Sequence, residues 1–211
     1  SLLADLLKQY PSDKTAIYYA MGLSNMTLYN QDVFSLREYL KKLRHLLEIN
    51  PSKSFAAFYS SSLVNITNYD PDIKAKRRYK LELQNLLMEY PYPEIALTYG
   101  KGLVNMTLYD PDIKAKRGYK LELQNMLIRY PYPEMAVIYE QGLINMILDD
   151  PDITVAKGYK LDIHQLLKKY PNPDMAVKYA SHLFGNITSE GNLAPKKQEL
   201  MDLKHLFSQF S

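Results

Sequence analysis

The sequence contains no cysteine, no tryptophan and no long apolar run. Without cysteine the chain has no disulfide, no thiolate nucleophile and no thiolate ligand for zinc, and we expect a reducing, cytoplasmic environment. No stretch approaches the roughly 18 consecutive apolar residues of a membrane-spanning helix, and no charged segment followed by an apolar one stands at the start. We therefore expect no membrane contact.

An excess of one charge is also absent. The chain of 211 residues carries 26 lysines and arginines against 23 aspartates and glutamates, a formal net charge of +3. Such a balance is typical of a mixed, solvated surface and does not favour a polyanion as the main partner. The 46% hydrophobic content is enough to build a sizeable core, which argues against disorder.

Tyrosine is plentiful, with 19 residues, and it recurs at a fixed interval, as proline does. Equivalent residues lie 40 positions apart without any insertion: Pro11, Pro51, Pro91, Pro131 and Pro171; Tyr19, Tyr59, Tyr99, Tyr139 and Tyr179; Leu23, Leu63, Leu103, Leu143 and Leu183. Internal repeats of roughly 20 to 50 residues are typical of solenoids. Five copies cover about residues 11–50, 51–90, 91–130, 131–170 and 171–211.

Each copy predicts two helices. In the third copy, apolar residues recur every three or four positions over about residues 93–109 and again over about residues 111–129, the spacing of one helical face. The stretch DPD, beginning at Asp70, Asp110 and Asp150, predicts that this first aspartate is the N-cap and the proline the first residue of the second helix. The stretches YPYPE and YPNPD end one helix at a proline and begin the next at another. Such short links predict antiparallel hairpins.

One hairpin exposes two apolar stripes and cannot bury them alone, so successive hairpins stack around a continuous core. We expect an all-α protein with a single repeat domain over residues 1–211, an α-solenoid of about five antiparallel helix hairpins. Residues 1–10 align with the end of a second helix, so we expect the chain to be a fragment of a longer protein. One position inside the first helices carries a small residue in four copies: Gly22, Ser62, Gly102 and Gly142. Because glycine is unfavourable inside a helix, the three glycines predict a close helix crossing at this position.

Small and large residues recur at fixed places in the first helix (A--Y--GL) and in the second (A---Y---L--LL--YP), and a proline closes the copy. This pattern resembles the tetratricopeptide repeat over the whole chain. The stretch KGLVN is similar to sequences of uncharacterised prokaryotic tetratricopeptide-like repeats. It departs from the family in its period of 40 residues, where the family has about 34, and in having no tryptophan. The resemblance implies a right-handed solenoid whose first helices line a concave groove for peptides or partner proteins.

An asparagine recurs inside every first helix but the last, at Asn25, Asn65, Asn105 and Asn145. Asparagine is a poor helix former, because its amide competes for the backbone. At 100° per residue, Asn105 lies within about 40° of Glu94, Thr98 and Lys101. The packing residues Ala96, Tyr99 and Leu103 lie nearly opposite, so we expect the asparagines outside the core.

The other positions on the asparagine side vary from copy to copy, and they include Tyr18, Phe58, Thr98, Lys101 and Gln141. An asparagine offers both a donor and an acceptor, which match the backbone of an extended peptide whatever its sequence. We therefore predict a concave stripe that binds an extended peptide or protein segment, with Tyr18 and Phe58 as apolar contacts.

Two other interpretations of the asparagines stay open. They can bridge adjacent first helices and fix the register of the repeats. Three of the four, together with Asn186, also begin the glycan acceptor pattern N-x-T, although a chain without a secretion signal does not favour glycosylation.

Two alternative functions also remain. The second helices carry basic residues, among them Lys74, Arg77, Arg78 and Arg117, that can track an RNA backbone or simply form a solvated outer face. The chain can also be a spacer between other domains. The four histidines occupy different places in their repeats, and no catalytic motif, metal-ligand spacing or cofactor loop is present, so we expect neither an enzyme nor a bound cofactor.

Overall fold

A computed structural model of the chain describes residues 13–189, 201 and 204. These residues form α-helices of 17 residues each and no strand: α2 (Asp13–Tyr29), α3 (Val33–Ile49), α4 (Lys53–Tyr69), α5 (Ile73–Glu89), α6 (Pro93–Tyr109), α7 (Ile113–Arg129), α8 (Pro133–Asp149), α9 (Ile153–Lys169) and α10 (Pro173–Ser189). We refer to α2, α4, α6, α8 and α10 as the first helices and to α3, α5, α7 and α9 as the second helices. The all-α fold is confirmed.

The predicted helix over residues 93–109 is confirmed by α6, which begins at Pro93. Its N-cap residue is Tyr92, whose side chain makes no capping hydrogen bond. The second helix of the same copy begins at Ile113, two residues later than predicted. The helix predicted over residues 1–10 and the second helix of the last copy lie outside the described residues.

The prediction that the first aspartate of DPD is the N-cap was wrong. The N-cap is the second aspartate: the carboxylate of Asp112 accepts hydrogen bonds from the backbone N–H groups of Lys114 and Ala115. The first aspartate, Asp110, instead ends the preceding helix as its C-cap, and its backbone N–H donates to the carbonyl of Met106. Pro111 therefore lies in the link between the helices, where its missing N–H costs no hydrogen bond.

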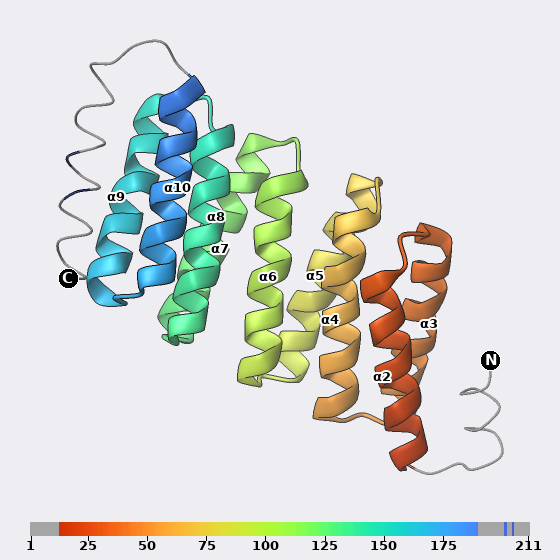
Figure 1. Ribbon diagram of the computed structural model, residues 1–211. Helices are drawn as coiled ribbons and strands as arrows, with labels where there is room; N and C mark the ends of the chain where they lie inside the picture. The colour runs from red at the N-terminus through yellow and green to blue at the C-terminus, as the bar shows by residue number, and fades with distance from the viewer. Residues whose placement is uncertain (1–12, 190–200, 202–203, 205–211) are drawn as a thin grey trace.

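The helices pack one after another along the chain, and α2 and α9 lie at opposite ends of the described stack (Figure 1). Each first helix contacts the next first helix, whereas each of α3, α5 and α7 contacts the two first helices that flank it and makes no comparable contact with another second helix. The layer of first helices is therefore the more closely spaced of the two. We call the side of the stack formed by the first helices the inner side and the side formed by the second helices the outer side.

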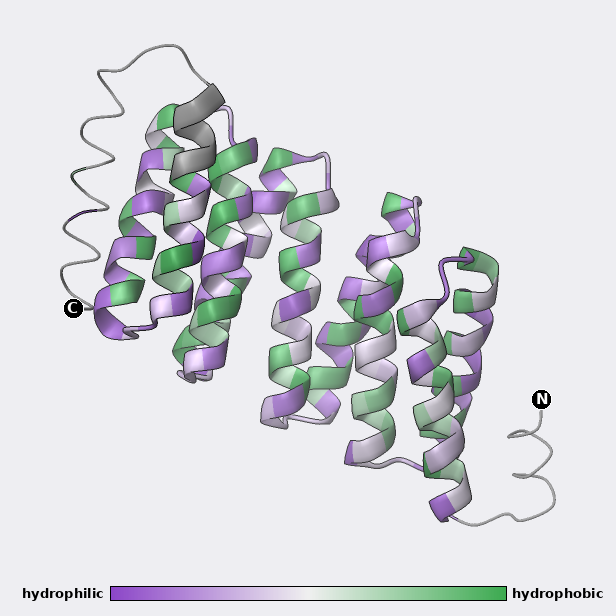
Figure 2. Cartoon of the chain, in the orientation of Figure 1, coloured by the Kyte–Doolittle hydropathy of each residue, from purple (hydrophilic) through white to green (hydrophobic). Residues whose placement is uncertain are grey.

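The core runs continuously along the stack instead of forming one centre. Fully buried residues recur once per copy, as Leu63, Leu103 and Leu143 do, and the tyrosines of the first helices, such as Tyr99 and Tyr139, join the same cluster. Apolar and polar bands alternate along every helix in Figure 2, the pattern of elements that bury one side only. The predicted packing role of these tyrosines is confirmed.

The predicted close helix crossing is confirmed at two of the glycines. A Cβ atom added to Gly102 would lie 2.6 Å from Cδ1 of Leu83 in α5, and one added to Gly142 would lie 2.5 Å from Cδ1 of Leu123 in α7. The missing side chain lets each of these first helices approach the second helix of the preceding copy. No described helix is long and apolar enough to cross a membrane.

Candidate functional site

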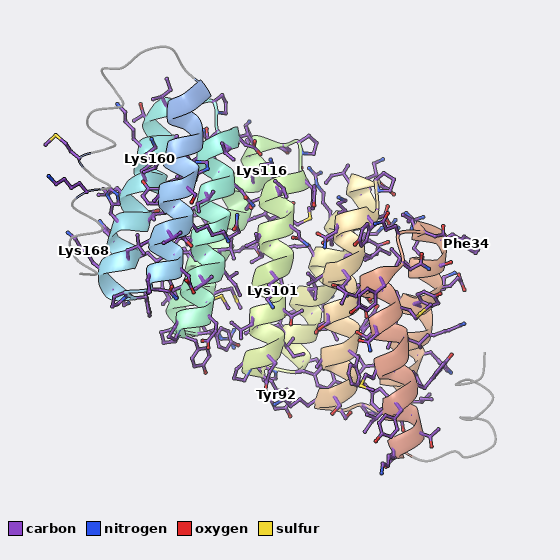
Figure 3. All side chains as sticks on the ribbon, in the orientation of Figure 1. Phe34, Tyr92, Lys101, Lys116, Lys160 and Lys168 are labelled. Atoms are coloured by element: carbon purple, nitrogen blue, oxygen red, sulfur yellow. The ribbon has the colours of Figure 1, made fainter. Side chains whose placement is uncertain are left out.

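The predicted stripe lies on the first helices, and at the place of Tyr18 the exposure of the side chain falls from the first copy to the fourth. Tyr18 is 50% exposed, Phe58 is half-buried against the core, and Ile138 at the equivalent place is buried against it. Lys101 is exposed, and Figure 3 shows it near the middle of α6 on the side of the first helices. The hydroxyl of Thr98 donates to the carbonyl of Glu94 in its own helix.

Three of the four asparagines donate a hydrogen bond from their side-chain amide to the preceding first helix. The Nδ2 atom of Asn65 lies 3.0 Å from Oγ1 of Thr27, that of Asn105 lies 2.6 Å from Oγ1 of Thr67, and that of Asn145 lies 3.0 Å from Oγ1 of Thr107. Asn105 and Asn145 also donate to the carbonyl oxygens of Val64 and Val104. These bonds tie α2 to α4, α4 to α6 and α6 to α8.

The orientation of each amide follows from its partner. The hydroxyl of Thr67 donates its own proton to the carbonyl of Val64 at 2.6 Å, so its oxygen is left to accept. The amide nitrogen of Asn105, and not its oxygen, must therefore face Thr67. The same relation holds for Thr27 and Thr107.

This bridge explains the N-x-T pattern of the first three copies, because Thr27, Thr67 and Thr107 each accept a hydrogen bond from the asparagine 38 residues later. The fourth copy has Ile147 in place of the threonine, and the fifth has Gly185 in place of the asparagine, so the two partners are lost together. The spacing between a threonine and the next asparagine is a sequence signal that our search within single copies missed.

The four asparagines differ in which polar atoms of their side chains are accessible to solvent. The side-chain oxygens of Asn65 and Asn105 are not buried and accept no hydrogen bond from the described residues. Asn25 is exposed, and its side chain makes no hydrogen bond with those residues. Asn145 is only 6% exposed, and its oxygen accepts a hydrogen bond from Nε2 of Gln141 at 3.1 Å. The first three positions therefore retain polar groups that a ligand can reach, and Asn145 with Gln141 forms a closed pair.

Exposed leucines near the ends of three first helices extend the same side: Leu28, Leu108 and Leu148. They lie three residues beyond the asparagines, which is one further step along the same helical stripe. The stripe predicted from the sequence ended at the asparagines and did not include these leucines.

The basic residues of the second helices are largely engaged between repeats. The guanidinium of Arg77 binds the fully buried carboxylate of Asp110 with two hydrogen bonds of 2.8 Å, and the hydroxyl of Tyr119 donates to the same carboxylate at 2.9 Å. Arg37 with Asp70 and Tyr79, and Arg117 with Asp150 and Tyr159, repeat this arrangement. We call each set an aspartate node.

The nodes shift the pKa of their members. Burial acts to raise the pKa of Asp110, but the hydrogen bonds from Arg77, from the backbone of Asp112 and from Tyr119 outweigh it, and the pKa falls below its usual value. For Asp150 the hydrogen bond from Arg117 dominates and lowers the pKa to about 2. Each carboxylate therefore stays ionised while buried.

A second set of contacts uses the remaining lysines. Lys80 pairs with Glu122, which also accepts the hydroxyl proton of Tyr99, and Lys120 pairs with Asp162, which accepts from Tyr139. Lys116 pairs with Asp149, and Lys76 lies 3.8 Å from the centre of the Tyr109 ring. Among the basic residues of the second helices, Lys74, Arg78, Lys114 and Lys157 are exposed and have no side-chain partner among the described residues.

The described residues contain no group of three or more histidine, cysteine, aspartate or glutamate side chains that could hold a metal ion. Taken together, the stacked hairpins and the contacts between them define a helical-repeat protein. Comparison with protein-family models, with curated proteins and with solved structures gives no match.

Proposed function

We propose that the chain is a tetratricopeptide-like, non-catalytic scaffold that binds an extended peptide or protein segment along the inner side of its first helices. The observation that carries the proposal is the pair of solvent-open side-chain oxygens on Asn65 and Asn105. Their amide nitrogens are held by the preceding helix, so the oxygens are fixed in orientation before a ligand arrives. Fixed acceptors suit backbone N–H groups, and they cost little conformational entropy on binding.

The dimensions agree with a short peptide. Packed helices lie about 8–10 Å apart, so three steps between four first helices cover about 24–30 Å. An extended chain advances about 3.3 Å per residue, so a segment of about eight residues spans them. Tyr18, Met21 and Phe58 offer apolar contacts at one end, and Lys101 offers a cation near the middle.

The test uses a phage-displayed library of nonapeptides selected on the full chain, followed by titration of the selected peptide in synthetic form. Asn105→Ala removes both the helix bridge and the open oxygen, so we expect weaker peptide binding and lower thermal stability. Thr67→Val removes the bridging acceptor only, so we expect lower stability with a smaller loss of binding.

Asn25→Ala separates the two roles. Asn25 makes no side-chain hydrogen bond among the described residues. We therefore expect Asn25→Ala to lower the affinity for the peptide and to leave the melting temperature unchanged. Unchanged affinity in both Asn25→Ala and Asn105→Ala would overturn the proposal and leave the asparagines as register-fixing bridges, which fits a structural spacer.

RNA binding through the second helices has less support. Arg77 and Arg117 donate to buried aspartates, and Lys80 and Lys120 form ion pairs with carboxylates of the next copy. A phosphate backbone would have to compete with these carboxylates. We therefore do not propose RNA as the ligand.

A further inference from the structure

The second helices α3 and α5 flank a groove on the outer side of the stack. Two cavities, of about 450 Å³ and about 390 Å³, lie along it and share Arg44, Tyr59 and Glu82 in their linings. The lining runs from Arg37 to Glu48 on α3 and from Arg78 to Glu89 on α5. Eleven residues of helix advance about 16 Å, which is the length of the groove along the helix axes.

Charge is distributed unequally along this groove. The cavity at the N-terminal ends of the helices is lined by Arg37, Lys41, Arg44 and Arg78, with Glu82 as the one acidic residue among the lining side chains. The cavity at the C-terminal ends is lined by Glu48, Glu82 and Glu89, with Arg44 as the one cation. The groove therefore has a basic end and an acidic end.

Three of these cations depart from the repeat. At the places of Lys41, Arg44 and Arg78, the following copies carry uncharged residues or a histidine: Leu81, Leu121 and Leu161; Gln84, Gln124 and His164; Gly118 and Gly158. The stretches DPDIKAKRRYKLEL and DPDIKAKRGYKLEL differ only at Arg78 and Gly118. The fold brings three separate departures from the repeat to one groove.

The opening of the groove has a local cause. Between α5 and α7 the same space holds the amine of Lys80, which is 13% exposed, pairs with Glu122 and lies within 6 Å of the ring centres of Tyr99 and Tyr119. Its counterpart on α3 is Leu40, which carries no amine. Glu82 is instead reached by Arg44, one turn further along α3, and the space beside Tyr59 and Tyr79 is left open.

The cations of the basic end are not equally engaged. Arg37 binds Asp70, Lys41 binds the half-buried Glu38, and Arg44 binds Glu48 and Glu82. Arg78 is exposed and has no hydrogen bond or ion pair with the described residues. Its guanidinium is free to bind a carboxylate with two parallel hydrogen bonds.

We propose that the groove between α3 and α5 binds a short extended peptide segment with an acidic side chain at the Arg78 end and a basic side chain at the Glu89 end. A span of about 16 Å corresponds to about five extended residues. Leu40, Tyr59 and Leu86 line the floor and suit apolar residues between the two charges. The glutamates of the acidic end would repel a continuous polyanion, so the charges favour a peptide of mixed sign over nucleic acid.

The probe is a fluorescein-labelled, end-capped heptapeptide with two glutamates, then leucine, tyrosine and leucine, then two lysines. Its control has the same composition with the charges alternating. We expect saturable binding of the first peptide to the full chain by fluorescence anisotropy, weaker binding of the second, and little competition from inorganic phosphate. Arg78→Gly should weaken the first peptide about tenfold, the effect of one lost charge-assisted contact of about 1.4 kcal/mol.

The repeats supply matched variants. Glycine is the native residue at position 118, so Arg78→Gly is compatible with this fold, and Arg78→Gln repeats the test with a better helix former. Gly118→Arg places the same charge on the equivalent position of α7 and should leave the affinity unchanged. Equal binding of both peptides, or wild-type affinity in both Arg78 variants, would overturn the proposal. Asn25→Ala should not affect this groove, so its outcome is independent of the proposed inner-side function.

Discussion

At the scale of single residues, asparagine is tolerated inside these helices because its amide finds a partner outside its own backbone. The Nδ2 atom of Asn105 is held between Oγ1 of Thr67 and the carbonyl of Val64. The usual cost of asparagine in a helix arises from competition for nearby backbone groups. A side chain that is already bound to the neighbouring helix no longer competes.

Glu140 is the residue that fits its surroundings least well. It is fully buried in α8, and neither carboxylate oxygen has a hydrogen-bond partner within the described part of the chain. Equivalent positions carry the small residues Ala20, Ser60, Gly100 and Ala180. Burial raises the pKa of Glu140 to about 8, and only the charge of Lys178 acts against the shift.

We predict that Glu140→Ala stabilises the protein at pH 8 by about 2 kcal/mol or more, the cost of burying an unsatisfied polar group. The folded-state pKa lies above the unfolded one, so the folded state holds the proton more tightly and stability falls as the pH rises from about 4.5 to about 8. The gain should therefore shrink at pH 4.5. Urea unfolding of both proteins at the two pH values measures it.

Leu143 lies fully buried on the same helix and provides the control. Leu143→Ala should destabilise the protein by about 2–5 kcal/mol at both pH values, because it only removes buried apolar volume. A Glu140→Ala gain that is independent of pH would contradict the assignment of the effect to ionisation.

At the scale of the elements, the two aspartates of DPD have different tasks. Asp112 caps α7 from an exposed position, whereas Asp110 is fully buried and accepts hydrogen bonds from Arg77, Tyr119 and the backbone of Asp112. Both residues precede the helix by a few positions, so capping rules alone do not distinguish them. The burial of Asp110 depends on an arginine 33 residues earlier in the chain.

We predict that Asp110→Ala costs about 2 kcal/mol or more of unfolding free energy, because it leaves the buried hydroxyl of Tyr119 and the backbone N–H of Asp112 without their acceptor. Asp112→Ala should cost about 1 kcal/mol, the usual value of an N-cap. Chemical denaturation of the two variants at pH 7 compares them. Equal losses, or a larger loss in Asp112→Ala, would show that the buried node adds little to stability.

The predictability of the fold and that of the site differ for a physical reason. The exact 40-residue period and the apolar spacing within each copy indicated stacked helix hairpins, since local patterns determine helices and their buried sides. The site involves partners in different copies: Asn105 meets Thr67, and Arg77 meets Asp110. A search within one copy cannot find such pairs, although the fixed offsets of 38 and 33 residues record them in the sequence.

At the scale of the whole molecule, the three aspartate nodes should govern stability in acid. The pKa values of Asp70, Asp110 and Asp150 all lie below their usual value, that of Asp150 at about 2. Groups with a lowered folded-state pKa contribute stability that is present above the unfolded pKa, about 3.9, and is lost as the pH falls through the folded value.

We therefore predict a steep loss of stability below about pH 4, following a maximum on the mildly acidic side of neutrality where Glu140 is protonated and the aspartates are still ionised. Circular dichroism melting curves between pH 2 and pH 9 give the profile. The acid limb should become shallower in Asp110→Asn. A profile that is flat between pH 5 and pH 2 would contradict the role of the nodes.

The aspartate nodes also bear on how such a chain changes its length. The second and third copies each provide an aspartate and a tyrosine that bind the arginine of the copy before, and each provides an arginine for the copy after. Inserting one more 40-residue copy of this kind beside them therefore creates one complete node and leaves no arginine or aspartate without its partner. Gene duplication or deletion of whole units can lengthen or shorten the array without a compensating substitution, and the near identity of residues 70–83 and 110–123 is what a recent event of this kind would leave.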